Sequence, residues 1–188
     1  MNAVLKTIEE RSSIRSYTSK KLSHDEIQLI LKAGLQAPTA RNQREIHISV
    51  LDGDHPILKE IEDEKRALQI LEADEDKKKT ILNAAHNFYY EAPTVFLLSA
   101  DKDFPWSHVD AGIAVENMAL AAQSLGLGNV ILGIIKKAML GDKQNYFAKA
   151  CQLPENYEFV IALAVGHANT EKEPHHIDLD NSVSFIKE

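Results

Sequence analysis

The stretch SHVDAGIAVENMALAAQSLGLG, residues 107–128, is the longest apolar helical pattern in the chain, and the other segments are interpreted around it. Alanines and large apolar side chains fill most of its positions, and a helix that is apolar on nearly every side is a buried helix. Ser107 and Asp110 form an S-x-x-D start signal, and Gly126 supplies the left-handed residue that commonly ends a helix. We expect this helix to be the element on which the rest packs.

The composition indicates one ordinary globular domain covering residues 1–188. Hydrophobic residues make up 44% and charged residues 26%, and the formal net charge of −7 argues against a nucleic-acid partner. The single cysteine, Cys151, excludes an internal disulfide and suits a reducing, cytoplasmic setting. The charged N-terminus does not read as a signal peptide, and no apolar run reaches membrane-spanning length.

The pattern around the central helix predicts helices and strands in an irregular order. Helices lead the chain and strands are few, which favours an α+β domain with one central sheet. The expected helices cover residues 2–10, 23–37, 56–72, 80–91 and 143–152, and the expected strands cover residues 46–50, 94–100, 129–135 and 159–165. The last twenty or so residues have no clear period, and we expect them to lie along a surface, possibly that of another subunit.

Two polar segments could bind a ligand. Residues 11–16, RSSIRS, place two guanidinium groups and three hydroxyls together, a set that suits a phosphomonoester. Residues 39–43, TARNQ, include amide side chains that both donate and accept hydrogen bonds, as reading the edge of a ring requires. For each segment the alternative is an ordinary solvated loop, and composition alone favours that alternative.

Other motifs give weaker evidence of a functional site. The cluster Gly126, Gly128 and Gly133 follows a helix and opens a strand, whereas a dinucleotide-binding glycine motif follows a strand and opens a helix. His175 and His176 are adjacent, so their rings would point to different sides of an extended chain and make a poor metal pair. We therefore predict no metal site and no side-chain nucleophile.

Together these segments resemble the nitroreductase family of flavin mononucleotide (FMN) enzymes over nearly the whole chain. The motifs that carry the resemblance are RSSIR at residues 11–15, APTARNQ at 37–43, DAG at 110–112 running to LGLG at 125–128, LG at 132–133 and AVG at 164–166.

The resemblance implies an α+β fold with a small mixed central sheet surrounded by helices and a long buried helix at the core of a homodimer. It implies FMN sites in the dimer interface, each held by both subunits, and a tail at residues 167–188 that packs on the partner. The implied cofactor-binding residues are Arg11, Ser12, Ser13 and Arg15 from one subunit, Pro38, Thr39, Asn42 and Gln43 from the other, Leu132 and Gly133 behind the ring, and His175 and His176 at the phosphate.

The chain departs from the family pattern in two places. Arg44 and Glu45 stand where the family usually has Pro and Trp, which leaves open how this loop is braced. The tail carries His175 and His176 where the family has a Lys and an Arg, with Lys172 as the alternative phosphate ligand. Imidazole loses its charge as pH rises through neutrality, so a histidine clamp predicts weaker FMN binding at higher pH.

The implied activity is NAD(P)H-dependent reduction of nitroaromatics, quinones or similar flat acceptors by a ping-pong mechanism, with the chemistry at the flavin N5. NADH and NADPH stay equal alternatives as donors. Two other functions stay open: a non-catalytic protein that stores FMN or senses redox state, and a related flavin chemistry such as enone reduction or dehalogenation.

Overall fold

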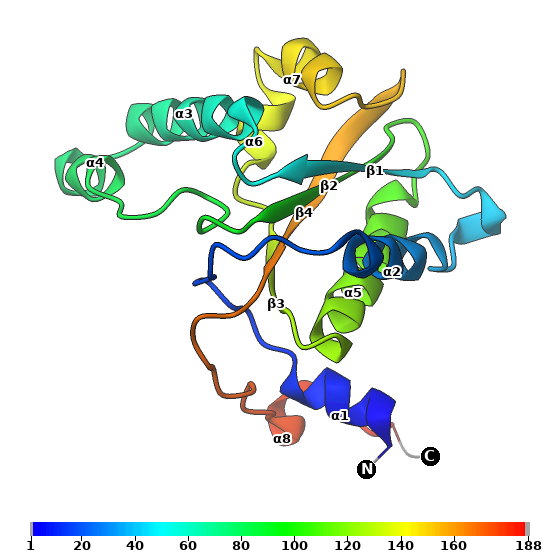
Figure 1. The fold of residues 1–188 in the computed structure, drawn as a ribbon. Helices are drawn as coiled ribbons and strands as arrows, with labels where there is room; N and C mark the ends of the chain where they lie inside the picture. Colours follow the sequence, from blue (N-terminus) through cyan, green and yellow to red (C-terminus); the bar gives the residue numbers. More distant parts are fainter. Residues whose placement is uncertain (1, 187–188) are drawn as a thin grey trace.

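The computed structural model describes residues 2–186, and within them four β-strands form one sheet in the order β1-β2-β4-β3 (Figure 1). The strands are β1 (Ile46–Asp52), β2 (Thr94–Asp101), β3 (Gly128–Leu132) and β4 (Tyr157–Gly166). The central strands β2 and β4 are the apolar runs of the sequence, as burial on both faces of a sheet requires. The strand expected at residues 129–135 ends at Leu132, because the chain turns there into a short helix.

The expected α+β class is confirmed, but the sheet is not mixed. All three strand pairs are antiparallel, because each inner strand lies between neighbours that run against it. Within residues 2–186 the parallel pairing is limited to an isolated bridge between Ser13 and Asn129.

Helices cover both faces of the sheet. Their bounds are α1 (Ala3–Glu10), α2 (His24–Leu35), the 3-10 turn η1 (Ala40–Asn42), α3 (Pro56–Leu71), α4 (Glu75–Leu82), α5 (Ser107–Ser124), α6 (Lys136–Leu140), α7 (Gln144–Ala150) and α8 (Leu179–Ser182). In Figure 1, α3, α6 and α7 lie on one side of the sheet, and α2 and α5 lie on the other.

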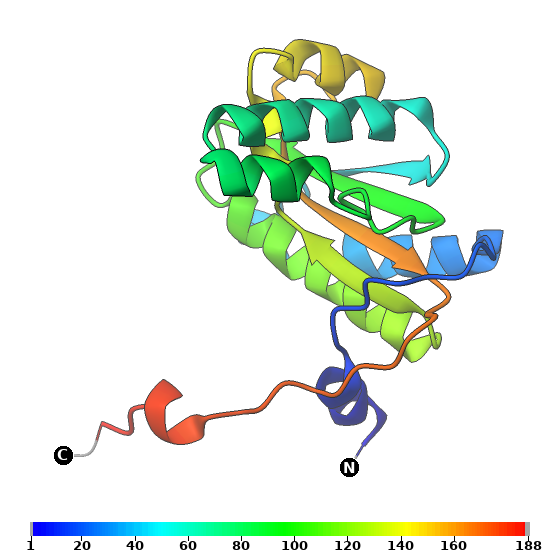
Figure 2. The same ribbon diagram turned by 90° about the vertical axis from the view of Figure 1, so that its left-hand side faces the viewer.

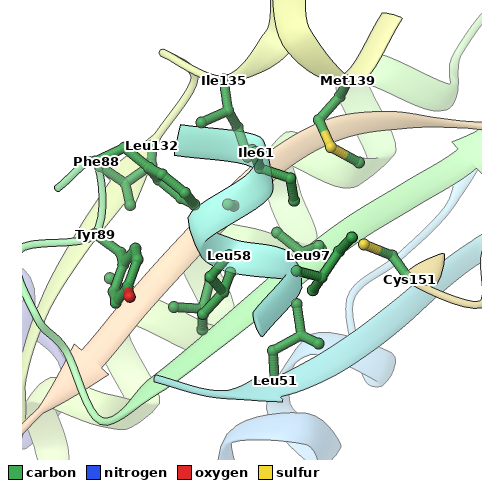
Figure 3. Close-up of a cluster of buried hydrophobic side chains, with 14 of the residues drawn as sticks. Leu51, Leu58, Ile61, Phe88, Tyr89, Leu97, Leu132, Ile135, Met139 and Cys151 are labelled. Atoms are coloured by element: carbon green, nitrogen blue, oxygen red, sulfur yellow. The ribbon is translucent and has the colours of Figure 1, made fainter. Parts of the chain in front are cut away.

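Alternation along β2 builds a separate core on each face of the sheet. Leu97 points toward α3, where it packs with Leu58 and Ile61 in the cluster shown in Figure 3. Leu98 points the other way and packs with Met118 of α5. Because successive side chains of a strand face opposite sides, one apolar run supplies both cores.

The central helix α5 is buried on one side only in the single chain. Ala111, Ala114 and Met118 are buried, whereas Val109 is 52% exposed and Ile113 is 37% exposed. Both of these exposed apolar side chains lie on the face turned away from the sheet. The single chain therefore leaves a stripe of its most apolar helix uncovered.

The sequence predicted the C-terminal end of α5 correctly and the N-terminal cap incorrectly. Gly126 has φ +75°, so the left-handed helix end is confirmed. The start signal is wrong as a cap: the Ser107 hydroxyl donates to the carbonyl oxygen of Asp101, and the Asp110 carboxylate accepts from Ala40. Both side chains form tertiary hydrogen bonds and do not cap the helix.

The helix expected at residues 80–91 is wrong in position. α4 begins earlier, where the Asp74 side chain accepts from the Lys77 N–H, and it ends at Leu82. Contacts with α3 then hold the following residues in turns: Arg66 of α3 donates to the carbonyl oxygen of His86 at 3.2 Å. The charge run at residues 74–79 is thus largely the solvated face of α4.

The tail leaves the body of the molecule after β4 and passes α1 (Figure 2). Residues 168–186 are exposed and, apart from α8, extended or irregular. Several of its apolar side chains face solvent in the single chain: Ile177, Leu179, Val183, Phe185 and Ile186.

Candidate functional site

Residues 11–15 follow α1 and lie beside β3 as a short extended stretch. Ser13 forms the parallel bridge to Asn129, and the Ile14 N–H donates to the Asn129 carbonyl oxygen at 2.9 Å. Asn129 is fully buried, and its Nδ2 donates to the carbonyl oxygen of Ala119 in α5. The segment is therefore fixed to the sheet and to α5, which argues against the solvated-loop alternative.

The side chains of this segment divide between two sides. Ser12 and Ile14 are buried, Arg11 and Ser13 are partly exposed, and Arg15 is exposed. This is the alternation of an extended chain. Arg11, Ser13 and Arg15 consequently share one side, which is what a common anionic ligand requires.

Ser12 lies on the opposite side from the other three predicted ligands. Its hydroxyl donates to the carbonyl oxygen of Lys172 in the tail at 3.3 Å. Both residues line a hollow of about 500 Å³ between α1, the end of α5 and the tail. A contact of Ser12 with FMN stays a prediction, and in this chain its hydroxyl ties the segment to the tail.

Arg11 is held at the end of α1 with its guanidinium beside α5. Its side chain is 15% exposed, and Nε lies 3.7 Å from Oε1 of Glu116. This long, half-open ion pair is a weak one. A phosphate dianion with bidentate geometry could compete successfully for the same guanidinium.

Arg15 lies over an aromatic ring. Its guanidinium carbon is 5.8 Å from the ring centroid of Tyr90, a residue with φ +55°. Nearby, the Tyr17 hydroxyl donates to the Ile14 carbonyl oxygen at 2.6 Å, and burial raises the pKa of Tyr17 well above its ordinary value. Tyr17 is therefore a neutral donor that braces the segment from below, while Tyr90 supports Arg15.

Residues 39–43 form the second predicted binding segment, and side chains brace it at both ends. The Ala40 N–H donates to Oδ2 of Asp110 at 2.9 Å, and the Arg44 N–H donates to the Thr39 hydroxyl at 3.0 Å. Asp110 is buried in the first turn of α5. The start of α5 thus fixes the conformation of this loop.

The same loop has an unusual backbone. Arg41, Asn42 and Arg44 have φ of +56°, +54° and +55°. Left-handed conformations are strained for residues other than glycine, least so for asparagine, and they persist where the surrounding structure holds them. Such strain is common at ligand sites. The side chains of Pro38, Asn42 and Gln43 are exposed, and the Asn42 Oδ1 accepts from the Arg44 Nε at 3.2 Å.

The remaining predicted ligands fall in two places. Leu132 is buried with its side chain in the core of Figure 3, so it can offer only backbone to a ring. Gly133 is exposed, and an added Cβ would meet only Ile161, at 3.6 Å. His175 and His176 are exposed in the tail and make no hydrogen bond or ion pair within residues 2–186.

The structure does not bring the two binding segments together in one chain. Ser12 shares its hollow with Gln123 at the end of α5, whereas Ala40 is bound to Asp110 at the start of α5. Thirteen residues of α-helix separate these two contacts, about 20 Å along the axis. Arg11 pairs with Glu116 in the middle of α5, so each chain presents the two halves of the predicted site at different positions along its central helix.

Sequence reasoning missed several residues of this region. Tyr90 gave no signal, since its role depends on a turn that the pattern did not predict. Glu116 is an acid within the apolar central helix, and no local pattern predicts its pairing with Arg11. Asp110 was assigned to a helix cap, and Glu45, now found buried beneath the loop, was noted only as a departure from the family pattern.

Metal and membrane features are absent from the part of the chain that the structure describes. Residues 2–186 contain no group of three or more His, Cys, Asp or Glu side chains arranged to hold a metal ion. None of the helices in the same range is long and apolar enough to cross a membrane.

Comparison with known proteins assigns the family. The sequence model of the nitroreductase family matches residues 8–167, so the chain belongs to the nitroreductase family. A solved nitroreductase with bound FMN from Desulfitobacterium hafniense DCB-2 is 31% identical, with a TM-score of 0.89 and complete coverage of both chains. The family and the α+β class expected from the sequence are both confirmed.

Two curated relatives are similar at lower identity. An FMN reductase [NAD(P)H] from Bacillus subtilis is 28% identical over 89% of this chain, and this chain spans 66% of that relative's length. A putative NADH dehydrogenase/NAD(P)H nitroreductase from Archaeoglobus fulgidus is 27% identical over 95% of this chain and 92% of its own.

Proposed function

We propose that this chain is an FMN-dependent oxidoreductase that works as a homodimer. It takes electrons from NADH or NADPH and passes them to nitroaromatics, quinones or similar flat acceptors. Membership of the nitroreductase family supports this function, as do the FMN-containing neighbour and the NAD(P)H-dependent FMN reductase among the relatives.

The observation that carries the proposal is the separation of the two binding segments along α5. One chain holds residues 11–15 beside the second half of this helix, between Glu116 and Gln123, and residues 39–43 at its start. The helix face between them exposes Val109 and Ile113. An antiparallel pair of α5 helices across a two-fold axis covers these apolar side chains and brings the start of one helix toward the end of the other.

The residues present fit FMN. Arg11 and Ser13 offer a guanidinium and a hydroxyl on the same side of a fixed segment, the donor set for a phosphate. Thr39, Asn42 and Gln43 of the second copy, with Pro38 beside them, offer the mixed donors and acceptors that a flavin edge requires. His175 and His176, or Lys172, complete the phosphate end from the tail.

Bound FMN supplies the two-electron chemistry, so no side chain needs to act as a nucleophile. The chain contributes position and charge. Arg15, supported by Tyr90, places a cation that stabilises negative charge developing on the ring edge. The backbone at Leu132 and Gly133 closes one side of the ring and excludes water from it.

Other exposed apolar surfaces support the dimer. α1 is amphipathic, yet none of its residues is buried in the single chain, and Val4, Leu5 and Ile8 are exposed. The tail exposes a further apolar set between residues 177 and 186. We assign both surfaces to contacts with the second copy, with the tail packing on the partner.

The test is to purify the protein, measure its molar mass in solution and record its absorption spectrum. A yellow dimer whose flavin bleaches on anaerobic addition of NADH or NADPH supports the proposal. A dimer that binds FMN but is not reduced by either donor is instead a storage or sensing protein, the function that the Arg44 and Glu45 departure keeps open. Parallel assays with nitroaromatics, quinones and enones then separate nitroreduction from related flavin chemistry.

We place the protein in the cytoplasm. The support is Cys151, a free buried thiol whose pKa burial raises to about 11. Such a thiol is unreactive and suits a reducing compartment.

A further inference from the structure

The observation behind this inference is a buried acid beneath the loop of residues 39–43. Glu45 is only 7% exposed, and both of its carboxylate oxygens are buried without a hydrogen-bond partner among the described residues. A carboxylate in that position is costly, because burial removes the water that would stabilise its charge.

The groups around Glu45 are acidic or neutral. Asp110 of α5 and Asp101 of β2 face it, Tyr157 of β4 lies close by, and Asp103 lines the same hollow of about 230 Å³. Two of these acids already have a donor elsewhere: the Nδ2 of Asn156 donates to Asp101 and to Asp103, at 2.9 Å each.

The nearby cations turn away from Glu45. The Arg44 guanidinium bonds the Asn42 side chain at 3.2 Å. His108, in the first turn of α5, lies 3.9 Å from Glu158 and 3.4 Å from Lys136. Glu45 forms no ion pair within residues 2–186, so neither a cation nor another donor accounts for its charge.

We propose that Glu45 and Asp110 hold one proton between them, and that this shared proton positions the loop of residues 39–43 for FMN. With the proton in place, Glu45 donates to one oxygen of Asp110. The other oxygen stays free to accept the Ala40 N–H at 2.9 Å. Glu45 is thus a positioning residue that acts through Asp110, and this role rests on the proposed function of the loop.

Chemistry and geometry agree on where the proton resides. Burial raises the pKa of Glu45 above its ordinary value of 4.5, and the close approach and charge of the Asp110 carboxylate, with the charge of Asp101, raise it further. When the proton leaves to solvent, two carboxylates face each other in a buried space with Asp101 nearby. Their repulsion weakens the contact with Ala40, which is what holds three left-handed residues in place.

The sign of the pH effect follows from the raised pKa. The folded protein binds this proton more tightly than the unfolded chain does. The stability that it contributes is therefore complete below the ordinary value of 4.5 and is lost as pH rises through the raised value. FMN affinity should fall over the same range, because the loop loses its brace.

The experiment measures the FMN dissociation constant of the parent and of Glu45→Gln by flavin fluorescence from about pH 4.5, the ordinary pKa of the side chain, up to about pH 9. As pH increases over this range, we expect the dissociation constant to rise about tenfold or more in the parent. In Glu45→Gln, whose amide donates at every pH, it should rise by less than about twofold. Asp110→Asn should flatten the curve likewise, which covers the case in which Glu45→Gln does not fold. Asp103→Asn, an exposed acid of the same hollow, should follow the parent.

Two outcomes overturn the proposal. One is a parent-like pH response in both Glu45→Gln and Asp110→Asn. The other is a response that disappears in a His175→Ala, His176→Ala double variant and not in Glu45→Gln, which assigns it to the tail.

A second readout does not depend on FMN. In the FMN-free protein, the melting temperature of the parent should fall relative to that of Glu45→Gln as pH rises from about 4.5 to about 9. If the chain binds no FMN, the proposed function fails, and this comparison still decides whether the shared proton exists. If the melting temperatures of the two proteins depend equally on pH, the shared proton is rejected.

Discussion

At the scale of single residues, the alternation of side chains in residues 11–15 gives Ser12 and Ser13 different roles. The sequence alone does not distinguish these roles. Ser12 and Ser13 are identical side chains in adjacent positions, yet one is buried against the tail and the other stays on the side of Arg11. The difference follows from the bridge between Ser13 and Asn129, a contact with a residue far along the chain. The composition of the segment predicted a phosphate ligand. Only the tertiary pairing decides which of the two serine hydroxyls can reach that ligand.

Arg11 should carry the largest single contribution to phosphate binding. We expect Arg11→Ala to raise the FMN dissociation constant by about 10- to 100-fold, the range given by losing charge-assisted hydrogen bonds. Fluorescence titration measures the effect, and Lys6→Ala on the exposed side of α1 is the matched control. An unchanged constant in Arg11→Ala would remove this residue from the site.

Arg15 should instead tune the chemistry of the bound ring. A cation at the ring edge favours the reduced, more negative flavin, so Arg15→Ala should lower the two-electron reduction potential by about 30 mV or more. Tyr90→Leu should shift the potential in the same direction by less, because it removes only the aromatic support at 5.8 Å. Spectroelectrochemistry measures both variants against Lys20→Ala, and a potential equal to the parent's in Arg15→Ala contradicts the role.

At the scale of elements, the sequence succeeded where a segment's own pattern decides its structure. β2 and β4 follow from their apolar runs, and the end of α5 follows from Gly126. It failed at residues 80–91, where contacts with another helix decide. The binding loops were found as polar segments, but their braces at Asp110 and Tyr90 lie too far away in sequence to be read from a local pattern.

Glu62 of α3 holds the misassigned segment in its turns. This buried acid pairs with Lys65 at 2.9 Å and with Arg66, and it accepts the Phe88 N–H at 2.8 Å. Removing one partner of a buried ionic network leaves the others uncompensated. Glu62→Ala should therefore lower the free energy of unfolding by about 3–5 kcal/mol.

Urea denaturation measures that loss, and Asp63→Ala supplies the control. Asp63 pairs with Lys59 on the exposed side of the same helix, so its removal should change stability little. Equal effects of the two substitutions would show that the buried network does not hold the segment.

At the scale of the whole molecule, the single chain looks incomplete in three places at once. The uncovered face of α5, the amphipathic α1 and the apolar tail are all exposed, and the two halves of the site lie at different positions along α5. In the homodimer that we propose, one two-fold axis covers these surfaces and joins the two sets of predicted ligands. Dimer formation and FMN binding should therefore be lost together.

Ile113→Asp tests that coupling. A charge at the centre of the α5 stripe should prevent the two copies from packing, since an unpaired buried carboxylate is costly. Light scattering should then give the mass of a single chain, and the FMN dissociation constant should rise by about 100-fold or more although no predicted ligand is altered. Leu71→Asp, an exposed apolar residue at the end of α3, should leave both properties unchanged. A monomeric Ile113→Asp protein that keeps parental FMN affinity would mean that one chain holds the whole site, and the separation of its two halves along α5 would need another explanation.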